Sequence, residues 1–445
     1  MKGGVPRQQA IRNTGAKDPS SDQGEKNTVL DERLDRQVRI EGWDQRVLDK
    51  AKIGLVGDDD LLVSLYTMSA SALGLNTMIV VAPRLDDTLL ETARKVNPAL
   101  NISLMEGFYT HPVMDDIFTG CNAVVDLSQY GLANKLLLEK GFRETIPIVR
   151  GFCYEEDGEQ GFKIFTYMRG REWDELEQVV SPQNLPGDHF DDGVLDIIAS
   201  GIALEETKNI LMGQRVSEDV ITYKRTRLAA ARHDPNICVV GAGALGNFVG
   251  LGLAYSGFRR ITFIDPDVVE ITNLNRQVFL ADAIGLGKAA ALSQRLNDSF
   301  GIEVQPRVAY FRADTNISPY DVIFDCVDNF ETEILLSEKC QAHNKVLISG
   351  GTSENAGQVI VYDPTQRART PAELLGLYDI VGERKIETYE RVRASCAYRP
   401  DPSVIMANQI IAGFMVDSYR MLLDGQKAAN IFYDSTSDKK ILVES

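Results

Sequence analysis

The sequence predicts an α/β protein built from two doubly wound domains in tandem, each with a mainly parallel sheet. The main observation is an internal repeat, because residues 51–84 can be laid over residues 236–267 with one gap. Both segments are typical of an apolar strand, a glycine turn, an amphipathic helix and a second apolar strand. The likeness continues in three further pairs of segments: 121–130 with 320–329, 146–167 with 345–364, and 200–213 with 408–425. Strands that alternate with helices form parallel sheets covered on both faces.

The repeat also sets the expected domain boundaries. We expect a polar, disordered arm, a first domain, a linker and a second domain, at residues 1–28, 29–216, 217–235 and 236–445. Within the second domain, residues 365–395 have little apolar pattern and are expected to form a crossover segment. Each domain is long enough to bury a core of ordinary size.

Composition and charge exclude several classes of protein. The net charge of −17 argues against a general nucleic-acid binder, and short basic groups such as Arg259-Arg260 and 224–227 are expected to be solvated surface. No apolar run approaches the ~20 residues of a membrane span, and the N-terminus lacks the apolar centre of a secretory signal. The six cysteines form no CxxC pair, which predicts neither disulfides nor a zinc site and indicates a reducing cytoplasm.

The two repeats differ at the glycine turn. In the second, Gly241, Gly243 and Gly246 fit the G-x-G-x-x-G pattern of Rossmann-like domains, in which backbone amides and a helix N-terminus approach phosphates. Asp265 and Asp267 end the next strand, where an acid can bind ribose hydroxyls.

The first repeat reads Gly57-Asp58-Asp59-Asp60-Leu61-Leu62 at the same turn, which places carboxylates where a phosphate would lie. Its next strand ends in Val81-Ala82-Pro83-Arg84 instead of an acid. We expect the first domain to have kept the scaffold and lost the nucleotide site. The alternative is that it binds another ligand.

Residues downstream of the second turn favour ATP over a dinucleotide. A glycine fingerprint followed by an acid also fits NAD or FAD, but an oxidoreductase has no need for the polar residues that follow. Attack on the α-phosphate of ATP builds charge that cations and a metal must neutralise. Arg276 and Lys288 can supply positive charge, Asn273 and Gln277 hydrogen bonds, and Asp328 an oxygen ligand for Mg²⁺. In the alternative interpretation, Arg276 and Lys288 are ordinary surface charges.

Three motifs in this region carry a family resemblance. The run DVVEITNLNRQ, the GLGK at 285–288 and the DCVDN at 325–329 resemble the adenylation domain of ubiquitin-like-protein activating enzymes. They also resemble that domain in the sulfur-carrier adenylyltransferases of molybdopterin and thiamine biosynthesis. The segment from Arg33 to Arg39 is similar to the R-x-x-R-Q entry segment of the same family, so the likeness covers most of residues 31–425.

The resemblance implies a pseudo-dimer within one chain, in which an inactive adenylation domain faces an active one. It implies ATP and Mg²⁺ as cofactors and the C-terminal tail of a ubiquitin-like protein as the partner. It also implies that Arg36 crosses from the inactive domain to the phosphates held around Gly243, as a catalytic residue beside Arg276 and Lys288. One active site per chain is therefore expected.

Many members of the family form a thioester after adenylation, and Cys396 is the candidate nucleophile. It follows the crossover segment and precedes a helix expected near Ser403, and Arg393 and Arg399 lie close in sequence. Such surroundings lower a thiol pKa. In the alternative interpretation, Cys396 is a small core residue at the helix start. The other five cysteines are expected to be inert: Cys121, Cys153, Cys238, Cys326 and Cys340.

The leading hypothesis is adenylation of a ubiquitin-like protein, thioester formation on Cys396 and transfer to a conjugating enzyme. A second hypothesis keeps adenylation, of a sulfur carrier or a peptide precursor, without the thioester. A third is a non-catalytic scaffold that binds a ubiquitin-like protein, and the last is an NAD-dependent oxidoreductase. The family's paired CxxC zinc motifs, a separate cysteine domain and a ubiquitin-fold domain find no match in the sequence.

Overall fold

The computed structural model describes residues 31–58, 61–170, 174–229, 234–366, 369–382, 402–427 and 429–444. Residues Glu32–Ser445 form one compact unit. We call residues 32–229 the first half and residues 234–444 the second half. The expected arm at 1–28, most of the crossover segment and Cys396 lie outside the described residues.

The described part of the first half contains a seven-stranded sheet in the order β3-β2-β1-β4-β5-β6-β7. Its strands are β1 (Lys52–Val56), β2 (Thr77–Ala82), β3 (Asn101–Glu106), β4 (Ala123–Asp126), β5 (Ile148–Glu156), β6 (Glu159–Tyr167) and β7 (Ile221–Thr226). Its helices are η1 (Glu32–Leu34), α1 (Gln45–Lys50), α2 (Leu61–Leu73), α3 (Asp87–Val96), η2 (Pro112–Phe118), α4 (Gly131–Glu144), α5 (Asp174–Glu177) and α6 (Gly193–Leu211). Strands β1 to β5 pair in parallel, and β6 and β7 extend the sheet antiparallel.

The described part of the second half repeats this order in an eight-stranded sheet, β10-β9-β8-β11-β12-β13-β14-β15. Its strands are β8 (Asn236–Val240), β9 (Arg260–Ile264), β10 (Glu303–Arg307), β11 (Val322–Asp325), β12 (Val346–Thr352), β13 (Ala356–Tyr362), β14 (Asn430–Asp434) and β15 (Ile441–Glu444). Its helices are α7 (Ala244–Tyr255), η3 (Ile271–Asn273), η4 (Val278–Leu280), α8 (Lys288–Phe300), α9 (Phe330–Ala342), α10 (Pro371–Leu374), α11 (Leu377–Gly382) and α13 (Ile405–Leu423). Again five strands are parallel and the rest antiparallel.

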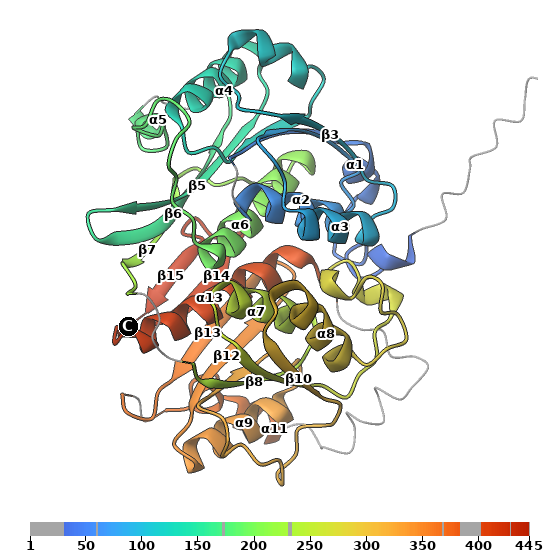
Figure 1. Ribbon diagram of the computed structural model, residues 1–445, viewed down its shortest axis with the longest axis vertical. Helices are drawn as coiled ribbons and strands as arrows, with labels where there is room; N and C mark the ends of the chain where they lie inside the picture. Colours follow the sequence, from blue (N-terminus) through green and yellow to red (C-terminus); the bar gives the residue numbers. More distant parts are fainter. Residues whose placement is uncertain are drawn as a thin grey trace, which may run out of the picture. The chain divides into compact units, whose positions relative to one another are not determined.

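The predicted fold class of two tandem Rossmann-like domains is therefore confirmed, with a mixed rather than purely parallel sheet in each half. Figure 1 shows the two sheets with helices α2, α6, α7 and α13 between them. Helix α6 packs against α2, α7 and α13, so the two halves share one helical layer. The buried hydrophobic residues of this layer and of both sheets form one continuous cluster.

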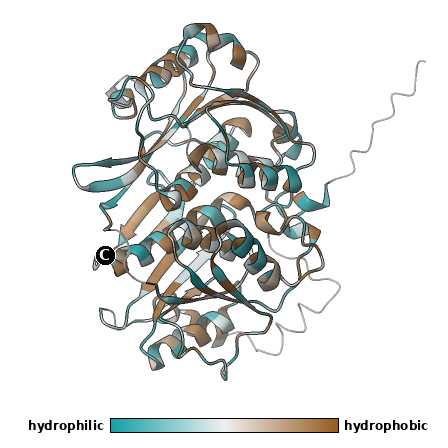
Figure 2. Ribbon diagram, in the orientation of Figure 1, coloured by the Kyte–Doolittle hydropathy of each residue, from teal (hydrophilic) through white to brown (hydrophobic). Residues whose placement is uncertain are grey.

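Sequence explains why these central helices are buried. Helices α6 and α13 carry apolar residues on all sides, which is typical of helices enclosed between two layers. Polar side chains in this layer also join the two halves, as Ser69 Oγ of α2 donates to Gln409 Oε1 of α13 at 2.7 Å. Figure 2 shows hydrophobic colour along the strands of the second sheet and hydrophilic colour at the tip of the β5–β6 hairpin. Among the described residues, no helix combines the length and hydrophobicity required to cross a membrane.

The expectation of a linker at 217–235 is wrong in part, because β7 lies within this range and pairs with β6. Alternate residues of β7 are buried, namely Ile221, Tyr223 and Arg225. Arg225 Nε donates to Asp417 Oδ1 of α13 at 2.9 Å, and its Nη2 donates to Asp192 Oδ2 at the same distance. Arg225 is buried at a position where an apolar residue is usual. For this reason the alternation of apolar and polar residues in β7 could not be recognised from the sequence.

Candidate active site

The glycine turn of the second half joins β8 to α7. Gly241 has a φ of +100°, and a Cβ there would lie 2.4 Å from the carbonyl oxygen of Cys326. A Cβ on Gly246 would lie 2.1 Å from the carbonyl oxygen of Gly241, so the helix and the turn can pack closely only without a side chain. At Gly243, by contrast, the nearest atom to a built Cβ is Gln277 Nε2 at 3.8 Å. The turn is therefore closely packed beneath Gly241 and Gly246 and open above Gly243.

Asp265 ends β9 and supports this turn from below. Its Oδ2 accepts a hydrogen bond from the amide of Ala242 at 2.6 Å, and its Oδ1 accepts from the amide of Asp267 at 2.8 Å. Burial raises the pKa of Asp265, and the positive charge of Lys288 opposes that shift. Both carboxylate oxygens of Asp265 thus already accept hydrogen bonds from backbone amides. A hydrogen bond to ribose hydroxyls, as predicted, would be added to these two.

Lys288 is the first residue of α8 and points toward the same edge of the sheet. Its Nζ donates to Asp267 Oδ2 at 3.1 Å. Its amide donates to the carbonyl of Asp267 at 2.8 Å. Only 9% of Lys288 and 6% of Arg276 is exposed, so the alternative that these are ordinary surface charges is wrong.

Arg276 lies between η3 and η4, close to a second arginine from the other half. Burial and the nearby guanidinium of Arg36 lower the pKa of Arg276 to about 9. Asp328 and Glu270 act in the opposite direction through their charges. The entry segment of the first half therefore does reach the second half, as expected for Arg36.

Two amides complete this group of residues. Asn273 Oδ1 accepts from the amide of Glu270 at 3.1 Å and so caps η3. Gln277 is 3% exposed, and among the described residues its Oε1 has no hydrogen-bond partner. An unbonded amide oxygen in a buried place costs roughly 1–3 kcal/mol. Its position beside Gly243 indicates that a polar ligand belongs there.

The carboxyl end of β11 is acidic. Asp325 accepts from Ser349 Oγ at 3.0 Å, and burial raises its pKa to about 7. Burial and the charges of Asp325 and Asp328 raise the pKa of Glu333 to about 8. Within the described residues, no group of three or more His, Cys, Asp or Glu side chains could hold a metal ion. A Mg²⁺ ion bound to phosphates uses one or two protein carboxylates, so Asp328 alone stays the predicted ligand.

The first half fills the corresponding positions with its own side chains. Strand register pairs Asp126 with Arg150 in the first sheet and Asp325 with Ser349 in the second. Arg150 is fully buried, and its Nε lies 3.7 Å from Asp126 Oδ2. It also donates to the carbonyl oxygens of Val179, Asp126 and Gly151. The carboxylate of the first half is thus neutralised internally, whereas among the described residues Asp325 of the second half has no ion pair with a lysine or arginine.

The turn of the first half is closed as well. Asp58 is 3% exposed, and its Oδ2 accepts from the amide of Gln129 at 2.7 Å. Burial raises the pKa of Asp58. A carboxylate engaged in this way occupies the place of a phosphate oxygen, which agrees with the predicted loss of the nucleotide site.

Five of the six cysteines are buried, in agreement with their predicted role as packing residues. Burial raises the thiol pKa of Cys121, Cys238, Cys326 and Cys340, which disfavours the reactive thiolate. Helix α13 begins only at Ile405, more than two turns' worth of residues after Cys396. Because Cys396 lies outside the described residues, its expected activation stays a prediction.

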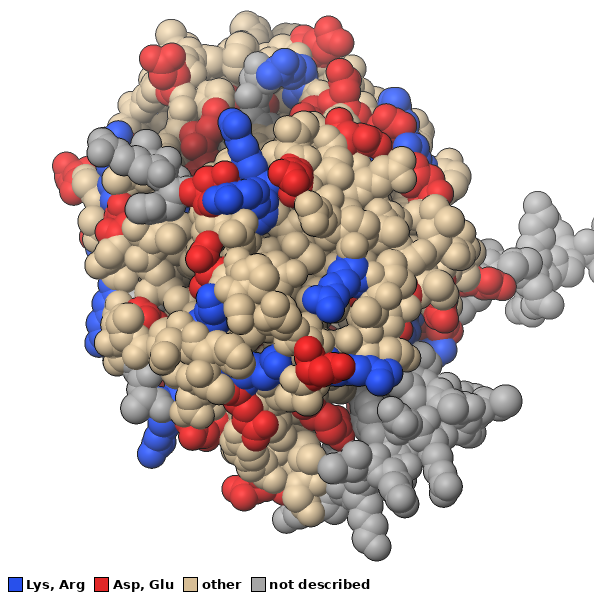
Figure 3. All heavy atoms as spheres, turned by 60° about the horizontal axis from the view of Figure 1, so that its bottom comes forward, with Lys and Arg blue, Asp and Glu red and all other residues tan. Residues whose placement is uncertain are grey.

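The expectation that the short basic groups are solvated surface is confirmed for Lys224 and Arg260, which are exposed and pair with Glu159 and Asp234. It is wrong for Arg225 of the group at 224–227, which is buried and paired with Asp417 and Asp192. On the face drawn in Figure 3, Lys and Arg side chains alternate with Asp and Glu and form no continuous basic surface.

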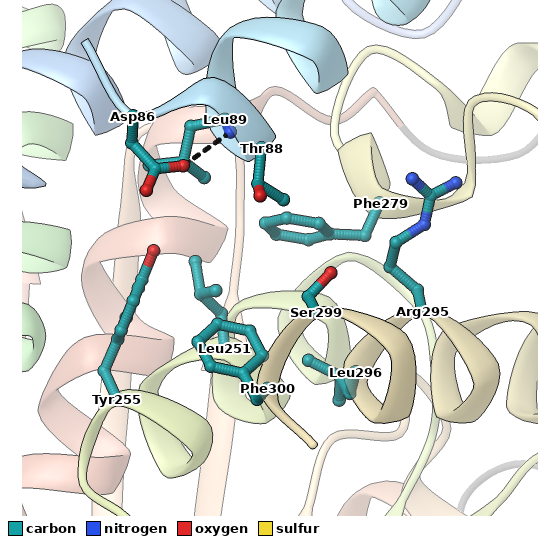
Figure 4. A pocket seen from close by; sticks show the side chains of 10 residues that line it. All are labelled: Asp86, Thr88, Leu89, Leu251, Tyr255, Phe279, Arg295, Leu296, Ser299 and Phe300. Atoms are coloured by element: carbon teal, nitrogen blue, oxygen red, sulfur yellow. Dashed lines mark hydrogen bonds between the residues drawn. The ribbon is translucent and has the colours of Figure 1, made fainter. Parts of the chain in front are cut away.

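A separate cavity of about 70 Å³ lies between α3 of the first half and α7, η4 and α8 of the second (Figure 4). The rings of Tyr255, Phe279 and Phe300 border it, and Asp86 Oδ1 caps α3 on its other side by accepting from the amide of Leu89. The cavity is far smaller than the ~300 Å³ of an ordinary ligand pocket. It contains none of the residues predicted to bind the nucleotide.

Residue-level prediction missed Asn275, which bonds to Arg276, and Gln37, which bonds to Asn275. Asn275 and Gln37 are both fully buried and bond to each other across the two halves. Both belong to motifs that the sequence singled out, NLNRQ and the R-Q entry segment, but their contacts depend on how the halves meet.

Parts of the chain are similar to known proteins. A sequence model described as the ThiF family matches residues 219–434. "Adenylyltransferase and sulfurtransferase MOCS3" of Anopheles gambiae is 37% identical over 133 residues, which cover 29% of this chain and 30% of that protein. "Probable molybdopterin-synthase adenylyltransferase" of Porphyra purpurea is 33% identical over 133 residues, 29% of this chain and 35% of that protein.

These matches span about a third of the length of the curated relatives. Among solved structures, E. coli MccB with ATP is similar with a TM-score of 0.38 and 18% identity, over 48% of this chain and 63% of that one. The sequence match lies on the half that carries the intact glycine turn, Arg276 and Lys288. The chain is thus similar to the ThiF family over residues 219–434.

Proposed function

We propose that the chain is an ATP-dependent adenylyltransferase that activates the C-terminal carboxylate of a small ubiquitin-like protein of the sulfur-carrier kind. The observation that carries this proposal is the buried Arg276, which faces a second cation, Arg36, and lies at the same sheet edge as an open glycine turn. Arg276 is 6% exposed and has a second cation nearby, which makes this place suited to an anionic ligand. The names of the sequence relatives support adenylyl transfer as the reaction.

The residues fit an adenine nucleotide in their chemistry. Gly243 leaves room for a phosphate next to the amides that begin α7, and Gln277 Oε1 is ready to accept a hydrogen bond. Arg276, Arg36 and Lys288 would neutralise the phosphates, and Asp328 would hold Mg²⁺. The metal, when bound, would withdraw charge from the phosphate oxygens and stabilise the leaving pyrophosphate.

In the reaction, one oxygen of the terminal carboxylate attacks the α-phosphorus of ATP. The bond between that phosphorus and the oxygen that bridges to the β-phosphate breaks, so pyrophosphate leaves and an acyl-adenylate forms. Charge on the phosphates grows in the transition state, and the fixed cations stabilise it there more than in the bound substrate. The chain's part is therefore mainly positioning and electrostatic stabilisation.

ATP–pyrophosphate exchange tests this proposal. We expect exchange only in the presence of a ubiquitin-fold protein that ends in glycine with a free carboxylate. The matched control is the same protein with an amidated C-terminus, which should give none. Binding of the small protein without exchange would contradict the proposal and favour a scaffold. Stabilisation by NAD, but not by ATP·Mg²⁺, would favour the oxidoreductase.

A thioester on Cys396 is the second step that we propose. Ser403, whose amide donates to the carbonyl of Arg36 at 3.4 Å, lies beside the arginine pair. The chain between Cys396 and Ser403 spans at most roughly 25 Å, so the thiol is within reach of an adenylate bound there. Its thiolate would attack the acyl carbon and release AMP, and a conjugating enzyme would accept the acyl group.

The variant Cys396→Ala separates the two steps. We expect it to retain pyrophosphate exchange and to form no covalent adduct with the small protein, while the wild type forms one that a thiol reductant cleaves. If the wild type forms no reducible adduct under conditions of exchange, adenylation stands and the thioester step is wrong.

A further inference from the structure

Asn275 joins three segments that meet beside Arg276. Its Nδ2 donates to Gln37 Oε1 of the first half and to the carbonyl oxygen of Ser403, each at 3.1 Å. Its Oδ1 accepts from Arg276 Nη1 at 2.8 Å. The amide group thus uses both its donor and its acceptor atoms, and the residue is fully buried.

Gln37 is held from the other side. Its Nε2 donates to Gln45 Oε1 at 2.7 Å and to the carbonyl oxygen of Leu73, the last residue of α2, at 2.8 Å. Because its donor atom faces these two acceptors, its oxygen must face Asn275. The orientation of both amides therefore follows from the bonding pattern.

Arg276 receives its orientation from this pair of amides. Its Nη1 also donates to the carbonyl oxygen of Thr272 at 3.0 Å, so one nitrogen of the guanidinium is held by two acceptors. Among the described residues, Nη2 and Nε make no hydrogen bond, which leaves them for a ligand. Repulsion from Arg36 would otherwise turn the guanidinium away, since the two charges oppose each other.

Ser403 connects the same point to the start of α13. Its amide donates to the carbonyl of Arg36, and its own carbonyl accepts from Asn275. The entry segment of the first half, the loop that carries Arg276 and the segment before α13 are therefore fixed to one another by a single side chain.

We propose that Asn275 and Gln37 are positioning residues that hold Arg276 in the orientation that binds the phosphates of ATP. The first half then acts on the nucleotide site twice, through the charge of Arg36 and through the Gln37–Asn275 bond. This inference rests on the proposed function, because it assigns phosphate binding to Arg276. An arginine side chain loses rotamer entropy when it binds a ligand, so orienting it in advance strengthens ligand binding.

The test compares Asn275→Ala, Gln37→Ala and the double variant with Ser69→Ala. Ser69 is the matched control, because its buried bond to Gln409 also joins the halves but does not lead to Arg276. In each single variant we expect the dissociation constant for ATP to be about tenfold larger and the KM for ATP to be raised. The double variant should show about the same tenfold loss, since both changes break one connection. Ser69→Ala should lower the melting temperature without a change in ATP affinity.

Three results would overturn the inference. One is that both single variants bind ATP as tightly as Ser69→Ala, and another is that their losses multiply to about a hundredfold in the double variant. The third is a wild type that neither binds ATP nor catalyses exchange, in which case the proposed function fails with it. Gln37 does not contact Arg276 directly. If Asn275→Ala does not fold, Gln37→Ala is therefore sufficient to test the inference.

Discussion

At the scale of single residues, the most informative feature is a buried arginine beside a second cation. Arg276 is 6% exposed, and the half-buried Arg36 of the other half repels it, while Asp328 and Glu270 attract it. Such an arrangement lowers the free energy of unfolding and is retained only where it serves binding. The first half shows the opposite solution, where Arg150 lies against Asp126 and the charge is neutralised internally.

The variant Arg276→Met should separate function from stability. It loses two hydrogen bonds, worth about 1 kcal/mol each, and removes a buried charge that faces Arg36. We expect its free energy of unfolding in urea to lie within about 1 kcal/mol of the wild type, while pyrophosphate exchange falls at least about 100-fold. Exchange at the wild-type rate would contradict the role of Arg276.

The raised pKa of Glu333 predicts how the free energy of unfolding depends on pH. Its pKa rises to about 8 in the folded chain, so the native state binds more protons than the unfolded state between about pH 4.5 and pH 8. The contribution of Glu333 to the free energy of unfolding is therefore fully present at low pH and is lost as the pH rises through 8. Glu333→Gln, which cannot ionise, should therefore be more stable than the wild type by on the order of 2 kcal/mol at pH 8.5.

Urea unfolding at pH 5 and pH 8.5, with EDTA and without nucleotide, measures this difference. The gain in Glu333→Gln should be small at pH 5, where the carboxyl of the wild type is already protonated. An equal gain at both pH values would show that ionisation of Glu333 is not its cause.

At the scale of elements, the glycine turn between β8 and α7 is the part that distinguishes the two halves. Gly241 and Gly246 are required by packing alone, whereas the space above Gly243 is open in the folded chain. The two kinds of glycine predict different results for substitution.

Gly243→Ala should fold normally and bind ATP poorly. A methyl group there meets only Gln277 Nε2 at 3.8 Å, and the φ of −75° suits alanine. We expect a melting temperature within about 2 °C of that of the wild type. The dissociation constant for ATP should be at least about tenfold larger, because the methyl group keeps a phosphate away from the backbone amides. Unchanged ATP affinity in thermal-shift titrations would place the phosphate elsewhere.

The sequence predicts local features well and long-range contacts poorly. The two-domain fold and the glycine turn follow from short patterns that are complete in themselves. Strand β7 was missed because Arg225 interrupts its apolar alternation, and the partner that makes this arginine tolerable, Asp417, is far away in sequence. For the same reason the bond between Gln37 and Asn275 could not be predicted, since it exists only where the halves meet.

At the scale of the whole molecule, the two halves form one compact unit held by a buried ionic network. Arg225 of β7 bonds to Asp417 of α13 and to Asp192, and Arg420 of α13 bonds to Asp192 at 2.8 Å. Tyr223 Oη donates to Asp417 Oδ2 at 2.8 Å. Each charge is therefore paired across the boundary between the halves.

Asp417→Ala should destabilise both halves together. Removal of Asp417 takes away one of the two carboxylates that pair with the buried Arg225, which costs about 3 kcal/mol. Trp43 and Trp173 both come before the second half in sequence, so neither tryptophan belongs to the half that carries Asp417. We expect the fluorescence and circular dichroism transitions to shift by the same amount, although Asp417 lies in the second half. A fluorescence transition that does not move would show that the halves unfold independently.

The central claim is that one ATP site per chain is built from both halves. Calorimetric titration of ATP·Mg²⁺ into the wild type, Arg36→Ala and Arg39→Ala tests it most directly. Arg39 lies in the same entry segment, is paired with Asp35, and is the matched control for loss of one positive charge. We expect one ATP per chain for the wild type and Arg39→Ala, and binding at least about tenfold weaker for Arg36→Ala. Two ATP per chain, or equal affinity in the two arginine variants, would contradict the claim.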